Sequence, residues 1–331
     1  KIHEKDLETI NGEIEERLAK RAESQKVIDE AKAEETKSEG GAEAEPEPEG
    51  GAVAVMEAKP RSDVSTDIEV PEPPFWGDRI VEGIKVEECF PFINENALFR
   101  GQWQFKKGKK SAEEYEAQIE DEIRPLFDRL KKDYGPALTP KVVYGYYPVQ
   151  SEAEDLIVFD PEDHDKEIDR FTFPRQEKKK RLCLSDFFKS VDTGEKDVLA
   201  MHCVTVGNQI SEVARELFEG DKYNEYLYVH GIGVESAEGL AELWHKRIRQ
   251  EMGISDQDSP KIKDLFTQKY RGSRYSFGYP ACPHMSDQEK LFRLLEPERI
   301  GCELTENWQI DPEQSTSAIV VHHPEAKYFS V

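Results

Sequence analysis

The sequence predicts an α+β fold, in which a mainly antiparallel twisted sheet is flanked by helices. Two observations lead to this prediction. Two runs rich in β-branched and aromatic residues, 141–147 and 155–159, flank a short polar segment, which is typical of an antiparallel strand pair. Stretches with helical periodicity separate the strand candidates without the regular strand-helix-strand alternation that a parallel α/β sheet requires.

The 331 residues, 37% of them hydrophobic, divide into three parts. Residues 1–36 place Leu7, Ile10, Ile14 and Leu18 three to four positions apart, which predicts an exposed amphipathic helix. Two interpretations are open. The helix is a docking or spacer helix that follows an upstream domain, or it is a solvated helix with little tertiary contact. Residues 37–74 are rich in Glu, Pro and Gly and predict a disordered linker, since they carry too little apolar surface to offset the entropy of ordering. An ordered domain is expected over 75–331.

Within that domain, each element is predicted from its periodicity. The acidic turn at 160–165 either tops a hairpin or holds a hard cation, although it lacks the spacing of a calcium loop. We expect Ser185 to cap a short helix at 184–188, and we expect the long helix at 223–252 to break near Gly231 or Gly233. The remaining predicted elements are a helix at 112–132, strands at 141–147, 155–159, 198–206 and 319–323, and a helix at 208–218.

The charge and the cysteines restrict the class of partner and the compartment. A net charge of −24 argues against a nucleic acid or an anionic membrane as partner, because both would repel the chain. The five cysteines occur singly and in odd number, which favours reduced thiols and a cytoplasmic location. No apolar run approaches the ~20 residues of a membrane span. Because the sequence does not begin with Met, we expect it to be a fragment of a longer chain.

Several familiar chemistries have no motif in this sequence. It contains no phosphate loop, no dinucleotide-binding fingerprint and no zinc-protease helix motif. His322 and His323 are neighbours that would point to opposite faces of a strand, so a structural role is favoured over a metal site. Cys282 has no basic neighbour that would lower its pKa and is interpreted as a packing residue. The sequence therefore predicts neither a catalytic dyad nor a metal centre.

The segment 271–283, RGSRYSFGYPACP, combines control of the backbone with planar polar groups. Gly278 permits a close backbone approach to a flat ring, Arg274 presents a guanidinium suited to a carboxylate, and Tyr279 can stack or hydrogen-bond. A zwitterionic nucleoside such as S-adenosyl-L-methionine carries a carboxylate and a purine, and its sulfonium favours a nearby acidic or aromatic group. The alternative is an ordinary irregular loop that packs its aromatic residues inward.

This segment closely resembles the S-adenosylmethionine loop of the activation domain of cobalamin-dependent methionine synthase. Other segments fall in the order of that family, and the resemblance covers essentially residues 75–331. These segments are VEGI from Val81, FRGQW from Phe99, GYYP from Gly145, CLSDF from Cys183, the helix 240–249 with His245, LTE from Leu304 and HPEAKYFSV from His323.

The resemblance implies a set of ligand residues. Around the loop they are Arg274, Ser276, Gly278 and Tyr279, and the C-terminal segment completes the site with Tyr328 and Phe329. The family has an aspartate for the ligand's amino group where this chain has Asn94 and Glu95. Of these two, Asn94 is the aligned residue, and Glu95 substitutes for it only after a small shift of register. The resemblance also implies Glu238 as an acidic residue near the site, and Gln268 stands where the family has a glutamate.

The function implied by the resemblance is reductive reactivation. The activation domain binds S-adenosylmethionine and supports methylation of inactive cob(II)alamin to methylcobalamin, with an electron from a flavodoxin-like donor. The cobalamin-binding signature and a zinc-binding cysteine cluster are absent from this sequence. The resemblance therefore implies that an upstream domain of the same polypeptide holds the cobalamin, and that residues 1–36 form the helix that leads out of that domain. It also implies that this chain alone does not make methionine. Two alternatives remain open: a non-catalytic module that senses S-adenosylmethionine or docks a corrinoid protein, and a stand-alone reactivator of another corrinoid methyltransferase.

Overall fold

A computed structural model describes residues 61–177 and 180–331. The predicted helix at 1–36 and most of the predicted linker lie outside the described residues. The helices are α2 Val86–Cys89, α3 Ala112–Gln118, α4 Arg124–Tyr134, α5 Gln209–Glu219, α6 Tyr223–Glu251, α7 Ile262–Leu265 and α8 Gln288–Leu295. The strands are β1 Gly77–Val81, β2 Lys141–Glu152, β3 Asp155–Phe159, β4 Glu167–Thr172, β5 Asp197–Thr205, β6 Ser273–Tyr275, β7 Glu303–Leu304, β8 Ile310–Asp311 and β9 Ser315–Val321.

Seven of these strands form one antiparallel sheet, as the sequence predicts. Its order is β4-β3-β2-β5-β9-β6, and β1 pairs with the first half of β2 while β3 pairs with the second half. The acidic turn at 160–165 joins β3 to β4, so the hairpin interpretation is confirmed. The strand β6 is three residues long and pairs only with β9, which places Arg274 on an edge of the sheet. Ser273 and Tyr275 of this strand are buried, and only Arg274 is partly exposed.

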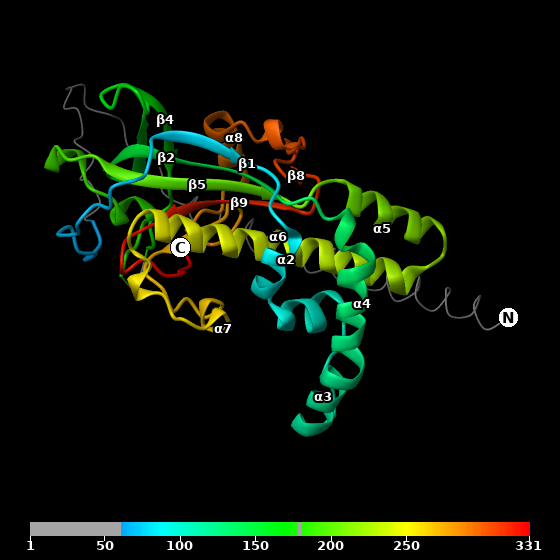
Figure 1. Ribbon diagram of the computed structural model, residues 1–331. Coiled ribbons are helices and arrows are strands. Elements are labelled where there is room, and N and C mark those ends of the chain that lie inside the picture. The colour runs from blue at the N-terminus through cyan, green and yellow to red at the C-terminus, as the bar shows by residue number, and fades with distance from the viewer. Residues whose placement is uncertain (1–60, 178–179) are drawn as a thin grey trace, which may run out of the picture. The chain divides into compact units, whose positions relative to one another are not determined.

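The central strands separate two hydrophobic cores. Side chains alternate between the two faces of a strand, so Val142 and Tyr144 of β2 pack with the helices α2, α4, α5 and α6, whereas Val143 and Tyr147 face the core that contains α8. Figure 1 shows α6 running along one face of the sheet and α8 on the other. Every residue of β5 is buried, as expected for a strand covered on both faces.

The long helix α6 runs unbroken over 29 residues, so the predicted break at Gly231 or Gly233 is wrong. These glycines serve packing instead. A Cβ on Gly231 would lie 2.8 Å from the Cβ of Gln102 and 2.9 Å from the Trp103 ring. Tertiary contact therefore compensates for the roughly 1 kcal/mol that a glycine costs within a helix.

Most of the other predicted elements are confirmed, and three details need correction. The helix predicted at 112–132 consists of α3 and α4 joined by a π-helical turn at Ile119–Ile123. Ser185 does not cap the short helix Leu184–Phe187, because it lies inside that helix and its Oγ donates to the carbonyl of Ala153 at 2.7 Å. The strand predicted at 319–323 begins earlier and ends at Val321, before the two histidines.

Residues 61–74, predicted as part of the disordered linker, contact the ordered domain. Arg61 donates to the carbonyl of Phe188 at 3.0 Å, and the Oγ of Ser62 donates to Asp186 at 2.6 Å. Val64 is buried in the core on the α8 side. The composition of this segment conceals these contacts, because a few residues among many prolines and glutamates find partners more than a hundred positions away.

Candidate functional site

A pocket of about 350 Å³ brings together four of the residues that the resemblance implies. Arg274 comes from β6, Glu238 from α6, Asn94 from the segment before the helical turn Ala97–Gln102, and Tyr328 from the C-terminal segment. The other lining residues are Phe92, Ala97, Glu235, Glu242, Leu265, Phe266, Gln268 and Tyr270. Four of the twelve lining side chains are aromatic, so the pocket offers flat apolar surfaces beside its charges.

Helix geometry places three carboxylates on one wall of this pocket. Glu235, Glu238 and Glu242 are separated by three and then four positions, which puts them on the same face of α6. Nη2 of Arg274 lies 3.2 Å from Oε2 of Glu238 and 3.7 Å from Oε2 of Glu242. The guanidinium is therefore held against the helix before any ligand arrives.

Burial shifts the protonation of two of these carboxyl groups. Glu235 is 6% exposed, and burial raises its pKa to about 7, although a hydrogen bond from Gln102 opposes the shift. Burial also raises the pKa of Glu242, and the charge of Arg274 opposes it. Oε1 of Glu242 is buried and has no hydrogen-bond partner within residues 61–177 and 180–331. A cation in the pocket would favour the ionised form of both groups.

Two buried histidines near Arg274 add no charge. His202 and His245 are inaccessible to solvent, and burial together with the positive charge of Arg274 lowers the pKa of His202 to about 3. Burial likewise lowers the pKa of His245, with Arg249 and Arg274 adding to the effect. Both rings are therefore neutral at pH 7, and the charge of the site comes from the glutamates and Arg274.

The loop after β6 lines a second pocket of about 430 Å³, which contains Ser276 and Tyr279 but not Arg274. The loop is closed by its own backbone, since Gly278 N–H donates to the carbonyl of Cys282 at 2.9 Å and Cys282 N–H donates to that of Tyr279 at 3.0 Å. Gly278 has a φ of +89°, and a Cβ there would collide with Met285. Ser276 and Tyr279 therefore lie outside the Arg274 pocket, although the sequence places them only two and five positions after Arg274.

The C-terminal segment is fixed beside Arg274. The Tyr275 hydroxyl donates to the carbonyl of Lys327 at 2.9 Å, and Lys327 Nζ donates to the carbonyl of Tyr270 at 2.9 Å. Tyr328 then contributes to the Arg274 pocket. Phe329 points elsewhere and packs against the rings of Tyr275 and Phe187.

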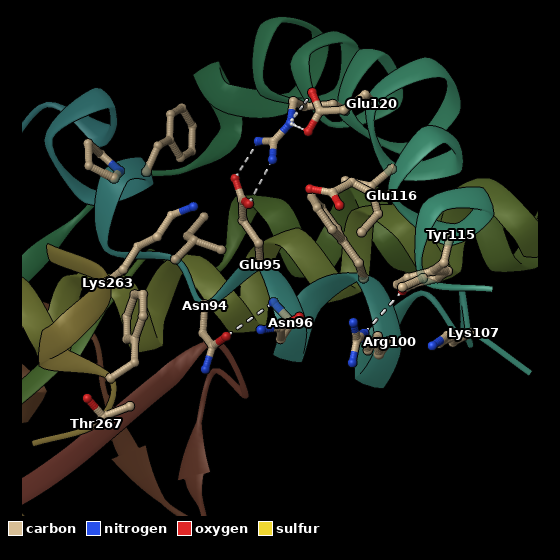
Figure 2. A pocket seen from close by; sticks show the side chains of 18 residues that line it. Asn94, Glu95, Asn96, Arg100, Lys107, Tyr115, Glu116, Glu120, Lys263 and Thr267 are labelled. Carbon is tan, nitrogen blue, oxygen red and sulfur yellow. Dashed lines mark hydrogen bonds and ion pairs between the residues drawn. The ribbon is translucent and has the colours of Figure 1, made fainter. Parts of the chain in front are cut away.

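Asn94 and Glu95 lie in different environments. Asn94 lines the Arg274 pocket and its larger neighbour of about 720 Å³, while its Oδ1 accepts from the backbone N–H of Asn96 at 3.1 Å. Glu95 lines only the larger pocket, where it forms a two-pronged ion pair with Arg124 at 2.7 and 3.2 Å; Figure 2 shows this pair and the second carboxylate, Glu120, on the same arginine. Of the two candidates, only Asn94 reaches the pocket of Arg274.

Sequence reasoning missed Glu235 and Glu242, together with the aromatic residues Phe92, Phe266 and Tyr270. The available signal was the set of three glutamates at helical spacing within a segment that is otherwise rich in small and apolar residues. Glutamates are almost never fully buried without a partner, so three of them on a core helix indicate a polar cavity beside it.

The structure supports the packing roles assigned to Cys282 and the histidines. Burial raises the pKa of Cys282 to about 12, so its thiol stays protonated. His322 Nε2 lies 2.7 Å from Oδ1 of Asp197, and His323 Nε2 lies 3.0 Å from the carbonyl of Ser65. In the part of the chain that the structure describes, no group of three or more His, Cys, Asp or Glu residues is arranged to hold a metal ion. No helix there is long and apolar enough to cross a membrane.

Comparison with known proteins places this chain in a family. Residues 85–331 match the family described as vitamin B12 dependent methionine synthase, activation domain. The chain belongs to this family. A solved structure of the MetH reactivation domain bound to AdoHcy matches with a TM-score of 0.71 and 25% identity, covering 80% of this chain and 83% of that one. The α+β fold expected from the sequence is therefore confirmed.

Two curated relatives extend the comparison. Methionine synthase of Mycobacterium tuberculosis (strain ATCC 25618 / H37Rv) is 47% identical over 293 residues, and that of Mycobacterium leprae (strain TN) is 44% identical over 292 residues. Each match covers 83% of this chain but 24% of the relative. The activation domain thus spans about a quarter of the length of the curated relatives it matches.

Proposed function

We propose that this activation domain binds S-adenosylmethionine in the Arg274 pocket and supports the reductive methylation of cobalamin within a methionine synthase. The observation that carries the proposal is the pocket itself, where a guanidinium, three carboxylates and aromatic rings converge. The family match supports it, as does the solved relative with AdoHcy bound, because S-adenosylhomocysteine is what remains after the methyl group leaves.

The residues of the pocket fit each part of this ligand. Arg274 would bind the ligand's carboxylate with its planar set of donors. The glutamates of α6 would face the ammonium and the sulfonium, and the aromatic lining would contact the purine. The volume of about 350 Å³ lies within the range of small-molecule sites.

Five further residues stay predicted ligand residues: Glu95, Ser276, Gly278, Tyr279 and Phe329. Ser276 and Tyr279 line the second pocket of about 430 Å³, so a ligand would contact them only if it extended beyond the Arg274 pocket. Glu95 would have to exchange Arg124 for the ligand, which makes Asn94 the better candidate of the pair.

The protein's contribution to the reaction is binding and orientation. Cobalamin, when bound by its own domain, would supply the nucleophile for the methyl group, so this chain would not need to provide a general acid or base. Arg274 and Glu238 would hold the amino-acid end of the ligand at fixed points, which sets the direction in which the sulfonium methyl is presented. We propose that the cobalamin is held by another domain of the same polypeptide and that a flavodoxin-like protein gives the electron.

Isothermal titration calorimetry of the full 331-residue chain with S-adenosylmethionine tests the binding. The wild type is expected to bind, and Arg274→Ala is expected to weaken binding by roughly 10- to 100-fold, the value of a charge-assisted pair. Arg293→Ala is the matched control, because Arg293 is exposed and pairs with Asp169 on another face. A wild type that gives no heat and no thermal shift at millimolar ligand refutes the assignment of the site.

The reaction itself is tested by adding the cobalamin domain and a chemical reductant. Loss of the cob(II)alamin spectrum in favour of methylcobalamin, dependent on both this chain and S-adenosylmethionine, supports reactivation. Binding of S-adenosylmethionine without any such conversion favours the sensing or docking module instead.

A further inference from the structure

Two of the three glutamates in the pocket wall, Glu235 and Glu242, are not among the binding residues that the resemblance implies. Glu238 is half exposed at its side chain and contacts Arg274 directly. Glu235 and Glu242 are each only 6% exposed and lie one turn before and one turn after it on α6. Carboxylates are almost never buried to this extent unless they are paired or needed for function.

The positive charge available inside the pocket does not match these three carboxylates. Arg274 is the one cationic side chain among the twelve residues that line it. Its Nη2 serves both Glu238 and Glu242, and Glu235 has only the neutral amide of Gln102, at 3.4 Å. When ionised, the three carboxyl groups leave an excess of two negative charges among the lining residues, because Arg249, whose charge also reaches Glu242, is paired with Asp258. Oε1 of Glu242 has no hydrogen-bond partner within the described residues.

An excess of buried negative charge stabilises a cationic ligand over a neutral one. At an effective dielectric constant of about 20, two unit charges about 4 Å apart interact by about 4 kcal/mol, and the interaction decreases with distance. S-adenosylmethionine carries a sulfonium cation, whereas S-adenosylhomocysteine, its demethylated product, carries a neutral thioether at the same position. Both compounds have the same purine and the same amino-acid group, so a difference in their affinity reports the charge and the methyl group at sulfur.

We propose that Glu235 and Glu242 are specificity-determining residues that make the pocket prefer the sulfonium ligand over its thioether product. This inference rests on the proposed function, and it assigns these two residues a role distinct from that of Arg274, which would bind a group common to both compounds. Favouring the sulfonium form limits inhibition by the product, because the charge that retains the substrate disappears when the methyl group leaves.

The protonation of Glu235 gives the proposal a second signature. Burial keeps the pKa of Glu235 near 7, so at pH 7 a substantial fraction of this carboxyl group is protonated before the ligand arrives. A cation would lower this pKa, and the proton would be released on binding. The groups that share the pocket with Glu235 are Glu238 and Glu242 of α6, Arg274 of β6, Tyr270 and Tyr328, and Gln102 is its hydrogen-bond partner.

The test is the ratio of two dissociation constants, for S-adenosylhomocysteine and for S-adenosylmethionine, measured by calorimetry on the full chain. Glu242→Gln and Glu235→Gln are each expected to lower this ratio by roughly three- to tenfold, as one missing charge interaction would. Glu216→Gln on α5 is the control, because Glu216 is exposed and lies outside the pocket. Circular dichroism establishes that each variant is folded before the ratio is taken.

A repeat of the titration in two buffers with different heats of ionisation counts the protons released at pH 7. The wild type is expected to release more protons with the sulfonium than with the thioether, and Glu235→Gln is expected to lose this difference. A ratio unchanged in both variants, with both compounds still binding, overturns the inference and leaves the proposed function intact. If the wild type binds neither compound, the proposed function fails and the inference fails with it.

Discussion

Replacement of Asp186 by Asn is expected to destabilise the chain strongly. The Asp186 side chain is 1% exposed and accepts from Nη2 of Arg175 at 2.9 Å and from the Ser62 hydroxyl at 2.6 Å. Arg175 is itself 3% exposed and also pairs with Glu154 at 2.9 Å, so a neutral residue at 186 would leave this buried guanidinium with one counter-charge instead of two. Removing one member of a buried pair costs about 3–5 kcal/mol, and we expect the free energy of unfolding to fall by this amount at pH 7.

Urea denaturation of the full chain at several pH values measures this loss. Burial would raise the pKa of Asp186, but hydrogen bonds from Arg175 and Ser62 bring it below its usual value. A depressed pKa stabilises the fold above the unfolded value of about 4, and this contribution is lost as the pH falls through the folded value. The difference between wild type and variant should therefore stay constant from pH 7 to about pH 5 and shrink as the pH falls below about 4. Asp165→Asn, in an exposed turn, is the control, and a loss below about 1 kcal/mol at pH 7 would refute the reasoning.

Three further predictions concern stability and thiol reactivity. Gly231→Ala should lower the free energy of unfolding by about 1–3 kcal/mol in urea, because the added Cβ meets Trp103, whereas Gly101→Ala has open space and should cost nothing comparable. Glu235→Gln should gain stability over the wild type as the pH rises from 5 to 8, by about 1–2 kcal/mol, since the raised pKa of Glu235 stabilises the wild-type fold only while this group is protonated; parallel pH profiles would contradict this. All five cysteines are buried and the pKa of Cys282 is about 12, so a chromogenic disulfide should label the native chain slowly and the unfolded chain at once; rapid labelling of Cys282 in the native state would be inconsistent with its packing role.

The sequence predicts the elements of this fold better than their ends. The strand pair β2 and β3, the buried strand β5 and the helices α5 and α6 all follow from hydrophobic periodicity, because each buries one face or both. The failures occur where a distant residue decides a local conformation. Gly231 breaks no helix because Trp103 packs against it, and Ser185 caps nothing because the carbonyl of Ala153 accepts its hydroxyl.

The site, like the fold, could be predicted from the sequence only in part. The residues on separate elements, Arg274, Glu238 and Tyr328, converge on one pocket, although nothing in their sequence spacing indicates it. Glu95 is held instead by Arg124, which lies 29 positions away, and such a pairing has no local signal. Ser276 and Tyr279 line a second pocket, although they follow Arg274 by only two and five positions.

The two walls of the Arg274 pocket have different freedom to change during evolution. One wall is α6, whose axial rise of about 1.5 Å per residue sets Glu235 and Glu242 roughly 10 Å apart. The rest of α6 belongs to the core, so this spacing cannot be altered without repacking the domain. The facing wall consists of a three-residue edge strand and a C-terminal segment that carries Tyr328. Changes of ligand size among relatives should therefore arise on the strand side, while the α6 side keeps a fixed pattern of charge.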